Sequence, residues 1–216
     1  MKLQYLGDSK DSFKWDYHHF LTHALGYSKL HVAWMMTPDD GKNHGNTAPE
    51  LYPADAAILL LCQKLRSTRD PNLIQTLPTL MGATYSVSFH DSGDANNPSF
   101  FSGIHADHNH VVFLDPDNGF EPERSATNQH VRYDDLEQLL VTLPSTAVVT
   151  VFQHHRRKKF QDDFARIRER LPCGHTTAIY APALMFVCIS MSPEAIERVC
   201  AINHDYARQR PVQVLP

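Results

Sequence analysis

The sequence lacks several patterns that would assign a function class at once. Its four cysteines form no C-x-x-C pair, which disfavours a zinc ribbon or a disulfide framework and predicts reduced, mostly buried thiols. It has no G-x-x-x-x-G-K-[ST] loop to cradle phosphates, which argues against a nucleoside triphosphatase. With a net charge of -4, it also lacks the positive excess of a protein that binds nucleic acid through bulk charge. Its partner must therefore be recognised locally.

Targeting and membrane signals are absent as well. The N-terminal residues do not form the basic and then apolar regions of a signal peptide, and no apolar run reaches membrane-spanning length. We therefore expect a cytoplasmic protein without a membrane partner. The 42% apolar content is enough for a sizeable core, and neither an internal repeat nor a low-complexity linker divides the chain. We expect a single α/β domain over residues 1–216.

The most informative stretch is the apolar run Val111–Leu114, which ends in the turn Asp115-Pro116-Asp117-Asn118-Gly119. Four large apolar residues without polar alternation favour a strand that is buried on both faces, as in a parallel sheet. Ligands bind beyond the carboxyl ends of such strands. The pattern therefore predicts that Asp115 is a site residue, although a carboxylate that only bonds turn amides remains the simpler alternative.

The remaining pattern alternates helices and strands. The pattern predicts helices over 54–65, 133–143 and 156–171, strands over 30–36, 85–89, 147–152, 176–180 and 184–191, an extended piece over 1–6 and a long loop over 90–110. The first helix would be capped by Asp8 or Ser9 and ended by Gly26, and the last would be capped by Ser192 and end near Arg208. This order predicts a Rossmann-like three-layer sandwich, with a mainly parallel sheet and a C-terminal antiparallel hairpin that supplies one antiparallel edge strand.

Three of the expected strands end in polar clusters. Asp39 and Asp40 follow the strand over 30–36, Asp115 and Asp117 follow Val111–Leu114, and His154 follows the strand over 147–152. If these strands are parallel neighbours, the clusters meet at one edge of the sheet. One alternative is a magnesium or manganese site on Asp39, Asp115 and Asp117, with Asp40 beside it and His154 assisting proton transfer, as a nuclease or phosphodiesterase would need.

Two charged segments extend this edge. The basic run from His154 to Lys159 begins where a helix is expected, and cations there oppose the helix dipole unless an anion lies nearby. A phosphate or a nucleic-acid backbone would remove that conflict, and a solvated basic turn is the alternative. In the N-terminal segment, Asp11 and Lys14 are spaced as a surface ion pair, while Lys10 or Lys14 could reach over the sheet edge to a phosphate or carboxylate.

The order of elements and the Asp-Pro turn resemble S-adenosylmethionine-dependent methyltransferases. Asp115-Pro116-Asp117-Asn118 is similar to the [D/N]-P-P-[Y/F] motif of the amino-methylating members, and the segment from Gly7 to Trp15 is similar to the N-terminal segment of the 23S ribosomal RNA adenine-N6 methyltransferases and of the three-Cys-motif partner proteins. The glycine-rich cofactor loop of the family is missing, since the strand over 30–36 is followed by Thr37-Pro38-Asp39-Asp40-Gly41.

The resemblance implies roles for individual residues. Asp115 would orient the target amine, and Pro116 would offer its carbonyl. Asp117 and Asn118 stand where the family has its second proline and its aromatic residue, so stacking on the base would need Phe120 or another side chain. To cofactor binding the resemblance assigns Asp8, Lys10, Asp39 and Asp40, with S-adenosylmethionine as the methyl donor.

Three functions therefore stay open. The first is a methyltransferase-like enzyme that acts on a nucleic-acid base or nucleotide, with Asp115, Pro116, Asp117, Asn118 and His154 in its catalytic site. The second is the metal-dependent hydrolase with Mg²⁺ or Mn²⁺ on the strand-end carboxylates. The third is a non-catalytic module that binds a nucleotide or RNA, which the missing glycine-rich loop would suit. The expected partner is a nucleic acid or nucleotide, and assembly into a homodimer is left open.

Overall fold

A computed structural model describes residues 2–39, 41, 47–91, 97, 99–156 and 158–216. Its main sheet has seven strands in the order β2-β1-β3-β6-β8-β7-β9. The strands are β1 (Lys29–Trp34), β2 (Ser86–Phe89), β3 (His110–Asp115), β6 (Val148–His154), β7 (His175–Ala181), β8 (Leu184–Ser190) and β9 (Gln213–Leu215). Beside this sheet, β4 (Gly119–Phe120) and β5 (His130–Val131) form a small parallel pair.

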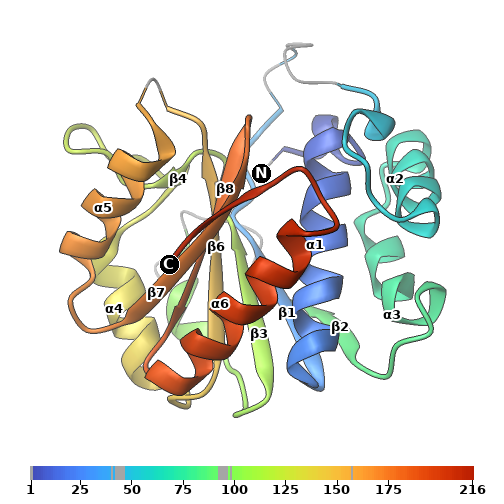
Figure 1. Ribbon diagram of the computed structural model, residues 1–216. Coiled ribbons are helices and arrows are strands. Elements are labelled where there is room, and N and C mark those ends of the chain that lie inside the picture. The colour runs from blue at the N-terminus through green and yellow to red at the C-terminus, as the bar shows by residue number, and fades with distance from the viewer. Residues whose placement is uncertain (1, 40, 42–46, 92–96, 98, 157) are drawn as a thin grey trace.

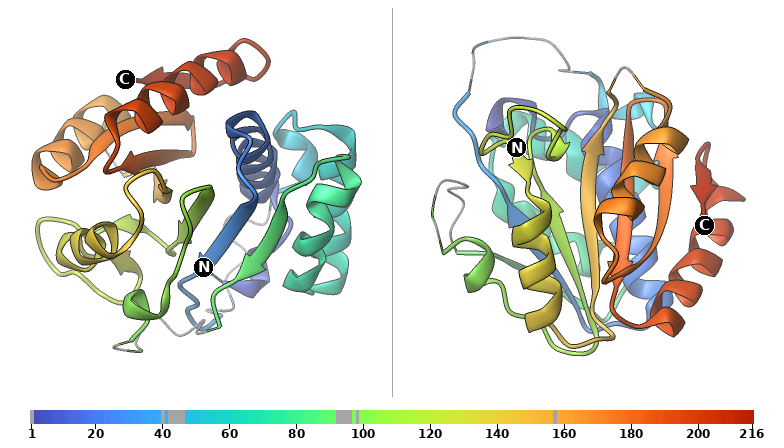
Figure 2. Two further views of the ribbon diagram at one scale, coloured as in Figure 1. Left: turned by 90° about the horizontal axis from the view of Figure 1, so that it is seen from below. Right: turned by 90° about the vertical axis from the view of Figure 1, so that its left-hand side faces the viewer.

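Helices cover both faces of the sheet, which gives three layers (Figures 1 and 2). The helices are α1 (Ser9–Leu25), α2 (Ala56–Thr68), α3 (Leu77–Leu80), α4 (Tyr133–Thr142), α5 (Phe160–Arg170) and α6 (Pro193–Ala207), and short 3-10 helices span Leu3–Tyr5, Pro49–Leu51, Pro71–Thr76 and Phe101–Gly103. The core under α1, α2 and α6 is separate from the core under α4 and α5. The expected Rossmann-like three-layer sandwich is confirmed.

Strand β3 lies in the middle of this arrangement and is buried along its whole length. Val111 and Phe113 face the core under α1, whereas Val112 and Leu114 face the core under α4. Alternate side chains of a strand point to opposite faces, so a strand covered on both faces must be apolar at every position. This explains why the sequence shows no polar alternation before Asp115.

Helix α1 begins and ends at the residues that the sequence suggests. Asp8 is its N-cap, with a side chain that accepts hydrogen bonds from the backbone N–H groups of Lys10 and Asp11. Gly26 ends the helix in the left-handed conformation, with a φ of 68°. Ser192 caps α6 in the same manner by accepting a hydrogen bond from Ala195 N.

The hairpin of β7 and β8 is present, but its place in the sheet differs from the expectation. Strand β8 is antiparallel to both neighbours and is inserted between β6 and β7, so it is an interior strand and not an edge strand. Every residue of β8 is buried. The edge is formed by β9, which pairs with β7 and was not expected, because three residues after a helix carry no readable period.

Two further expectations are wrong. The N-terminal extended piece contains the 3-10 helix Leu3–Tyr5. Helix α5 begins at Phe160 and not at Arg156, with Lys159 as its N-cap, so the basic run precedes the helix and does not form its first turn. The first turn instead carries Asp162 and Asp163, which suit the helix dipole. In the described part of the chain, no helix is both long and apolar enough to cross a membrane.

Candidate active site

The three strand ends meet at one edge of the sheet, as the sequence predicts. Strands β1, β3 and β6 are adjacent and parallel, with Trp34 opposite Asp115 on β1 and β3. A pocket of about 180 Å³ opens at this edge. It is lined by Lys2, Tyr5, Asp8, Lys10, Asp11, Lys14, Asp115, Pro116, Asp117, Asn118, Phe152 and His154. The pocket thus combines the ends of β3 and β6 with the start of α1.

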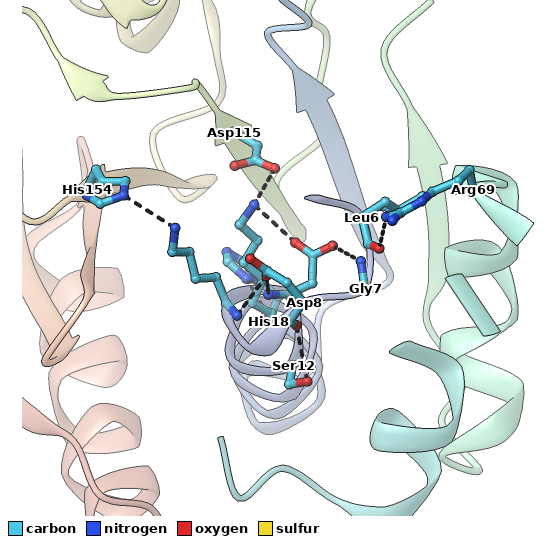
Figure 3. A network of polar contacts seen from close by, with 11 residues as sticks. Leu6, Gly7, Asp8, Ser12, His18, Arg69, Asp115 and His154 are labelled. Carbon is cyan, nitrogen blue, oxygen red and sulfur yellow. Dashed lines mark hydrogen bonds and ion pairs between the residues drawn. The ribbon is translucent and has the colours of Figure 1, made fainter. Parts of the chain in front are cut away.

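A buried lysine of α1, Lys14, organises the pocket, in which Figure 3 labels Asp8, Asp115 and His154. Lys14 Nζ lies 2.9 Å from Asp115 Oδ2 and 3.2 Å from Asp11 Oδ1. It also lies 4.9 Å from the centre of the Phe152 ring, which gives the ammonium a cation–π contact. Burial alone would lower the pKa of Lys14, but Asp115 and Asp11 raise it above its ordinary value. Lys14 is therefore a permanent cation that ties α1 to the end of β3.

Asp115 is fully buried and uses only one of its carboxylate oxygens within the protein. Oδ2 accepts the hydrogen bond from Lys14, whereas Oδ1 has no hydrogen-bond partner among the described residues. Burial raises the pKa of Asp115, and Lys14 offsets that effect only in part. The carbonyl of Pro116 likewise accepts no hydrogen bond from the described residues. Two unused acceptors on successive residues thus lie at the pocket.

Asp8 is the second unusual carboxyl group of the pocket. It is 3% exposed, and burial together with the nearby charge of Asp11 raises its pKa to about 7, although its helix-capping hydrogen bonds act in the opposite direction. The neighbouring carboxylate, that of Asp11, is held in place because its Oδ2 accepts a hydrogen bond from Gly7 N at 2.7 Å. Asp8 can therefore exchange a proton near neutral pH.

His154 and Lys10 form the polar side of the pocket. Lys10 Nζ lies 3.4 Å from His154 Nε2, and His154 Nδ1 lies 3.2 Å from the carbonyl oxygen of His155. Since a carbonyl only accepts, Nδ1 carries the imidazole proton and Nε2 accepts from the ammonium of Lys10. Burial, and then Lys10, lowers the pKa of His154. At neutral pH the imidazole is uncharged.

Asp117 and Asn118 also line the pocket, but their side chains have protein partners. Asp117 Oδ2 accepts a hydrogen bond from the Thr37 hydroxyl and forms an ion pair with Lys2 at 3.2 Å. The Asn118 side chain donates to Gln129 Oε1 at 2.9 Å. Both residues hold the chain in place beside Asp115.

Phe120 does not have the stacking role that the resemblance allowed. It is fully buried against Tyr133, with ring centres 5.6 Å apart, and its backbone N–H donates to Gln153 Oε1. The aromatic residues that line the pocket are Tyr5 and Phe152. A ligand can therefore contact these two rings but not Phe120.

The expected acidic residues after β1 are not part of the described pocket. Asp39 accepts a hydrogen bond from Gln4 N at 3.2 Å and does not line the pocket, and Asp40 lies outside the described residues. Asp39, Asp115 and Asp117 therefore have different partners, and the described residues contain no group of three or more ligands placed to hold a metal ion. The geometry gives the metal-site alternative no support.

Sequence reasoning missed the central part played by Lys14 and Asp11. Their spacing predicts a surface pair, and the pair exists, but both side chains are almost completely buried. The position of Lys14 near the start of its helix does predict that it can reach a carboxylate over the sheet edge, and that carboxylate is Asp115. The helix face could not be assigned from the sequence, since α1 buries Asp11, Lys14 and Asp16 as well as its apolar residues.

Comparison with known proteins does not add to what the geometry shows. No family model and no curated protein matches the chain. Among solved structures, human methyltransferase-like protein 13 in complex with SAH is similar over 89% of this chain and 91% of its own, with 12% sequence identity and a TM-score of 0.42. A likeness at this level carries nothing about activity, so the function has to be inferred from the site.

Proposed function

We propose that this protein is a methyltransferase-like enzyme that modifies an amino group of a nucleic-acid base or nucleotide. One observation carries the proposal: Asp115 Oδ1 and the Pro116 carbonyl are adjacent acceptors at a pocket, and neither has a hydrogen-bond partner among the described residues. A buried acceptor without a partner is costly, and a bound donor removes that cost. An amino group offers two N–H donors, which matches two acceptors.

The mechanism follows from how these acceptors are held. Lys14 fixes the Asp115 carboxylate through Oδ2, which leaves Oδ1 available to a hydrogen-bond donor of the substrate. When Oδ1 and the Pro116 carbonyl accept the two amino hydrogens, the nitrogen lone pair points away from these acceptors. It is then free to attack a methyl group placed on the opposite side of the nitrogen. Holding reactants in one geometry is worth several kcal/mol of the barrier, on the order of 7–11 kcal/mol in the best cases.

The proton released by the amine also has a defined acceptor. Because burial raises the pKa of Asp115, its carboxylate takes up a proton more readily than an exposed aspartate does. Oδ1 already accepts an amino hydrogen in the proposed geometry, so it receives the proton without further movement. Asp8, with a pKa of about 7, and the neutral His154 lie in the same pocket and can pass the proton to solvent.

The pocket suits part of S-adenosylmethionine. Four carboxylates and three ammonium groups line it, so its carboxylate acceptors fit the ammonium group and ribose hydroxyls of that molecule, which Asp8 would hold. S-adenosylmethionine supplies an electrophilic methyl group when bound. A volume of about 180 Å³ is below the roughly 300 Å³ at which pockets begin to enclose a drug-sized ligand. The described pocket therefore suits reacting groups and not the whole molecule.

The base needs an aromatic contact, and Tyr5 is our assignment for it. Tyr5 lies in the first 3-10 helix, lines the pocket and is half-buried, whereas Phe152 is almost fully buried under Lys14. Stacking of a base on an aromatic ring contributes about 1–3 kcal/mol. Tyr5 would supply the stacking that neither Asn118 nor Phe120 provides.

The test is methyl transfer from labelled S-adenosylmethionine to a mixed pool of RNA, DNA and nucleotides. Asp115→Asn keeps the size of the side chain but removes the strong acceptor, and transfer should fall by roughly a hundredfold or more, as for other single groups that bind the transition state. Asp205→Asn is the matched control, because Asp205 is an exposed aspartate of α6 that pairs only with Arg208. Circular dichroism of both variants checks that each one folds.

Two results would overturn the proposal. If Asp115→Asn transfers methyl groups at the rate of the wild type, Asp115 has no part in the mechanism. Binding of the nucleic-acid pool without any transfer by the wild-type protein would instead indicate a non-catalytic binding module. A ligand that binds only the native state raises its melting temperature, so S-adenosylmethionine should raise that of the wild type and of both variants.

A further inference from the structure

A second pocket, which we call the arginine pocket, lies close to the first and has no role in the proposed chemistry. It has a volume of about 240 Å³ and is lined by Pro122, Glu123, Arg124, Arg156, Lys158, Asp163 and Arg166. Four of these residues are cations and two are carboxylates. A positive surplus in a concave site indicates an anionic ligand.

The two central guanidinium groups are held in fixed positions. Arg166 Nη2 lies 3.1 Å from Asp163 Oδ1, and Arg166 Nη1 donates to the carbonyl of Glu121 at 3.3 Å. Arg156 donates to the carbonyl of Phe120, and its Nη1 lies 3.9 Å from the same Asp163 oxygen. Only 22% of the Arg156 side chain and 17% of the Arg166 side chain are exposed. These donors are therefore preorganised.

One buried carboxylate serves both guanidinium groups, which leaves their charge incompletely balanced. Burial lowers the pKa of Arg156, and the positive charge of Arg166 lowers it further while Asp163 opposes both. The Asp163 side chain is 2% exposed and contacts both guanidinium groups, so it orients them. An anion placed over both groups would relieve their repulsion.

The two outer cations remain available. Arg124 is exposed and has no hydrogen bond or ion pair among the described residues. The Lys158 ammonium pairs with Glu123 at 3.3 Å, and both side chains are more than half exposed. Such a pair is weak, on the order of 0–1 kcal/mol, so Lys158 can exchange Glu123 for a stronger anion.

Two chain segments connect the arginine pocket to the proposed active site. The first runs from Asn118 to Arg124 and the second from His154 to Lys158, and each segment lines both pockets. The segments are joined by the hydrogen bond from His154 N to the Asn118 carbonyl at 3.3 Å. Arg156 is two residues beyond His154, which is at most about 7 Å along an extended chain. One extended ligand can therefore occupy both pockets.

We infer that the arginine pocket binds a phosphate group of the substrate whose amino group enters the first pocket, with Arg124, Arg156, Lys158 and Arg166 as its cationic donors. Guanidinium groups fit phosphate oxygens in pairs, which explains why three of the four cations are arginines. The link to the first pocket rests on the proposed function, but the phosphate site itself does not.

The phosphate can belong to a free nucleotide or to a single strand of nucleic acid. A duplex is the poorer fit, because enzymes that act on a base need it out of the stack. The two sources differ in salt dependence, since each phosphate of a single strand that is neutralised contributes about 0.7 to the slope of log K against log salt concentration.

The experiment measures binding of a fluorescent single-stranded oligonucleotide, with adenosine monophosphate and inorganic phosphate as competitors. The double variant Arg124→Gln, Lys158→Gln removes two cations that make no buried contact. Its affinity should fall roughly tenfold, and its salt slope should fall by about 1.4 for two lost contacts. Arg208→Gln, at an exposed ion pair on α6, carries the same type of charge change and should bind like the wild type.

The outcomes separate the two sources and the two proposals. If the oligonucleotide binds tightly and its salt slope falls in the double variant, the phosphate belongs to a single strand. If the double variant loses equal affinity for adenosine monophosphate and for the oligonucleotide, the phosphate belongs to a free nucleotide. The inference is overturned if no probe binds or if the double variant binds every probe like the wild type. Binding is measured without a methyl donor, so a wild-type protein that binds the probes but transfers no methyl group would overturn the proposed function and leave the phosphate site standing.

Discussion

Replacing Lys14 by methionine is the sharpest test of how the proposed active site is built. The substitution keeps a long flexible side chain but leaves Asp11 and Asp115 as buried carboxylates without their cation. At an effective dielectric constant of about 20, the gross attractions over 2.9 and 3.2 Å are about 6 and about 5 kcal/mol. The cost of taking three charges out of water offsets most of that attraction.

The expected loss of unfolding free energy is about 3–5 kcal/mol at neutral pH, which is typical when one partner of a buried ion pair is removed. The loss should become smaller in acid. Without Lys14, the pKa of Asp115, which burial already raises, rises further, so the native state of the variant binds a proton that the unfolded chain has released. Its stability is therefore greatest below the unfolded pKa and falls as the pH rises.

Urea denaturation of both proteins at several pH values measures this difference. A second variant, Lys14→Met with Asp115→Asn, removes one of the two uncompensated charges and should recover part of the lost stability. If Lys14→Met costs less than about 1 kcal/mol, as an exposed pair would, or if the cost does not change with pH, Lys14 is not the buried counterion of these carboxylates.

Two further predictions concern the start of α1. Asp8→Asn keeps a good N-cap but removes the group with a pKa of about 7. Because this pKa is raised above 3.8, Asp8 favours folding below pH 4, and that contribution of at most about 4 kcal/mol is lost as the pH rises through 7. The stability of the wild type relative to the variant should therefore fall between pH 4 and pH 7. Gly7→Ala should cost about 3 kcal/mol or more in thermal unfolding, since φ is 81° and a Cβ would lie 2.2 Å from the Cys62 carbonyl. Gly26→Ala, with a φ of 68° and open space, should cost only about 1–2 kcal/mol, and equal costs would mean that Gly7 has room.

Much of the fold could be predicted because strong local patterns matched the tertiary structure. The unbroken apolar run before Asp115 indicates a strand that is buried on both faces. Asp8, Gly26 and Ser192 indicate where two helices begin or end. The place of β8 could not be read in the same way. Its continuous burial fits an interior strand as well as an edge strand covered by helices, and only pairing with both β6 and β7 decides between them.

The candidate site was predictable in part for the same reason. Parallel strands bring their carboxyl ends together, so the convergence of Asp115 and His154 follows from topology. The ion pair between Lys14 and Asp115 joins residues 101 positions apart, and no local period reports such a contact. Asp39 does not line the pocket as expected, because a carboxylate after a strand can accept a hydrogen bond from a nearby backbone N–H, here that of Gln4.

The central claim is that the pocket at Asp115 directs methyl transfer to an amino nitrogen. It is tested most directly by incubating the wild-type protein with labelled S-adenosylmethionine and nucleic acid, digesting the product to nucleosides and identifying the methylated atom by mass spectrometry. The two acceptors at Asp115 and Pro116 predict that the label is on an exocyclic amino nitrogen. Label on a ring carbon, a ring nitrogen or a ribose hydroxyl would contradict this account.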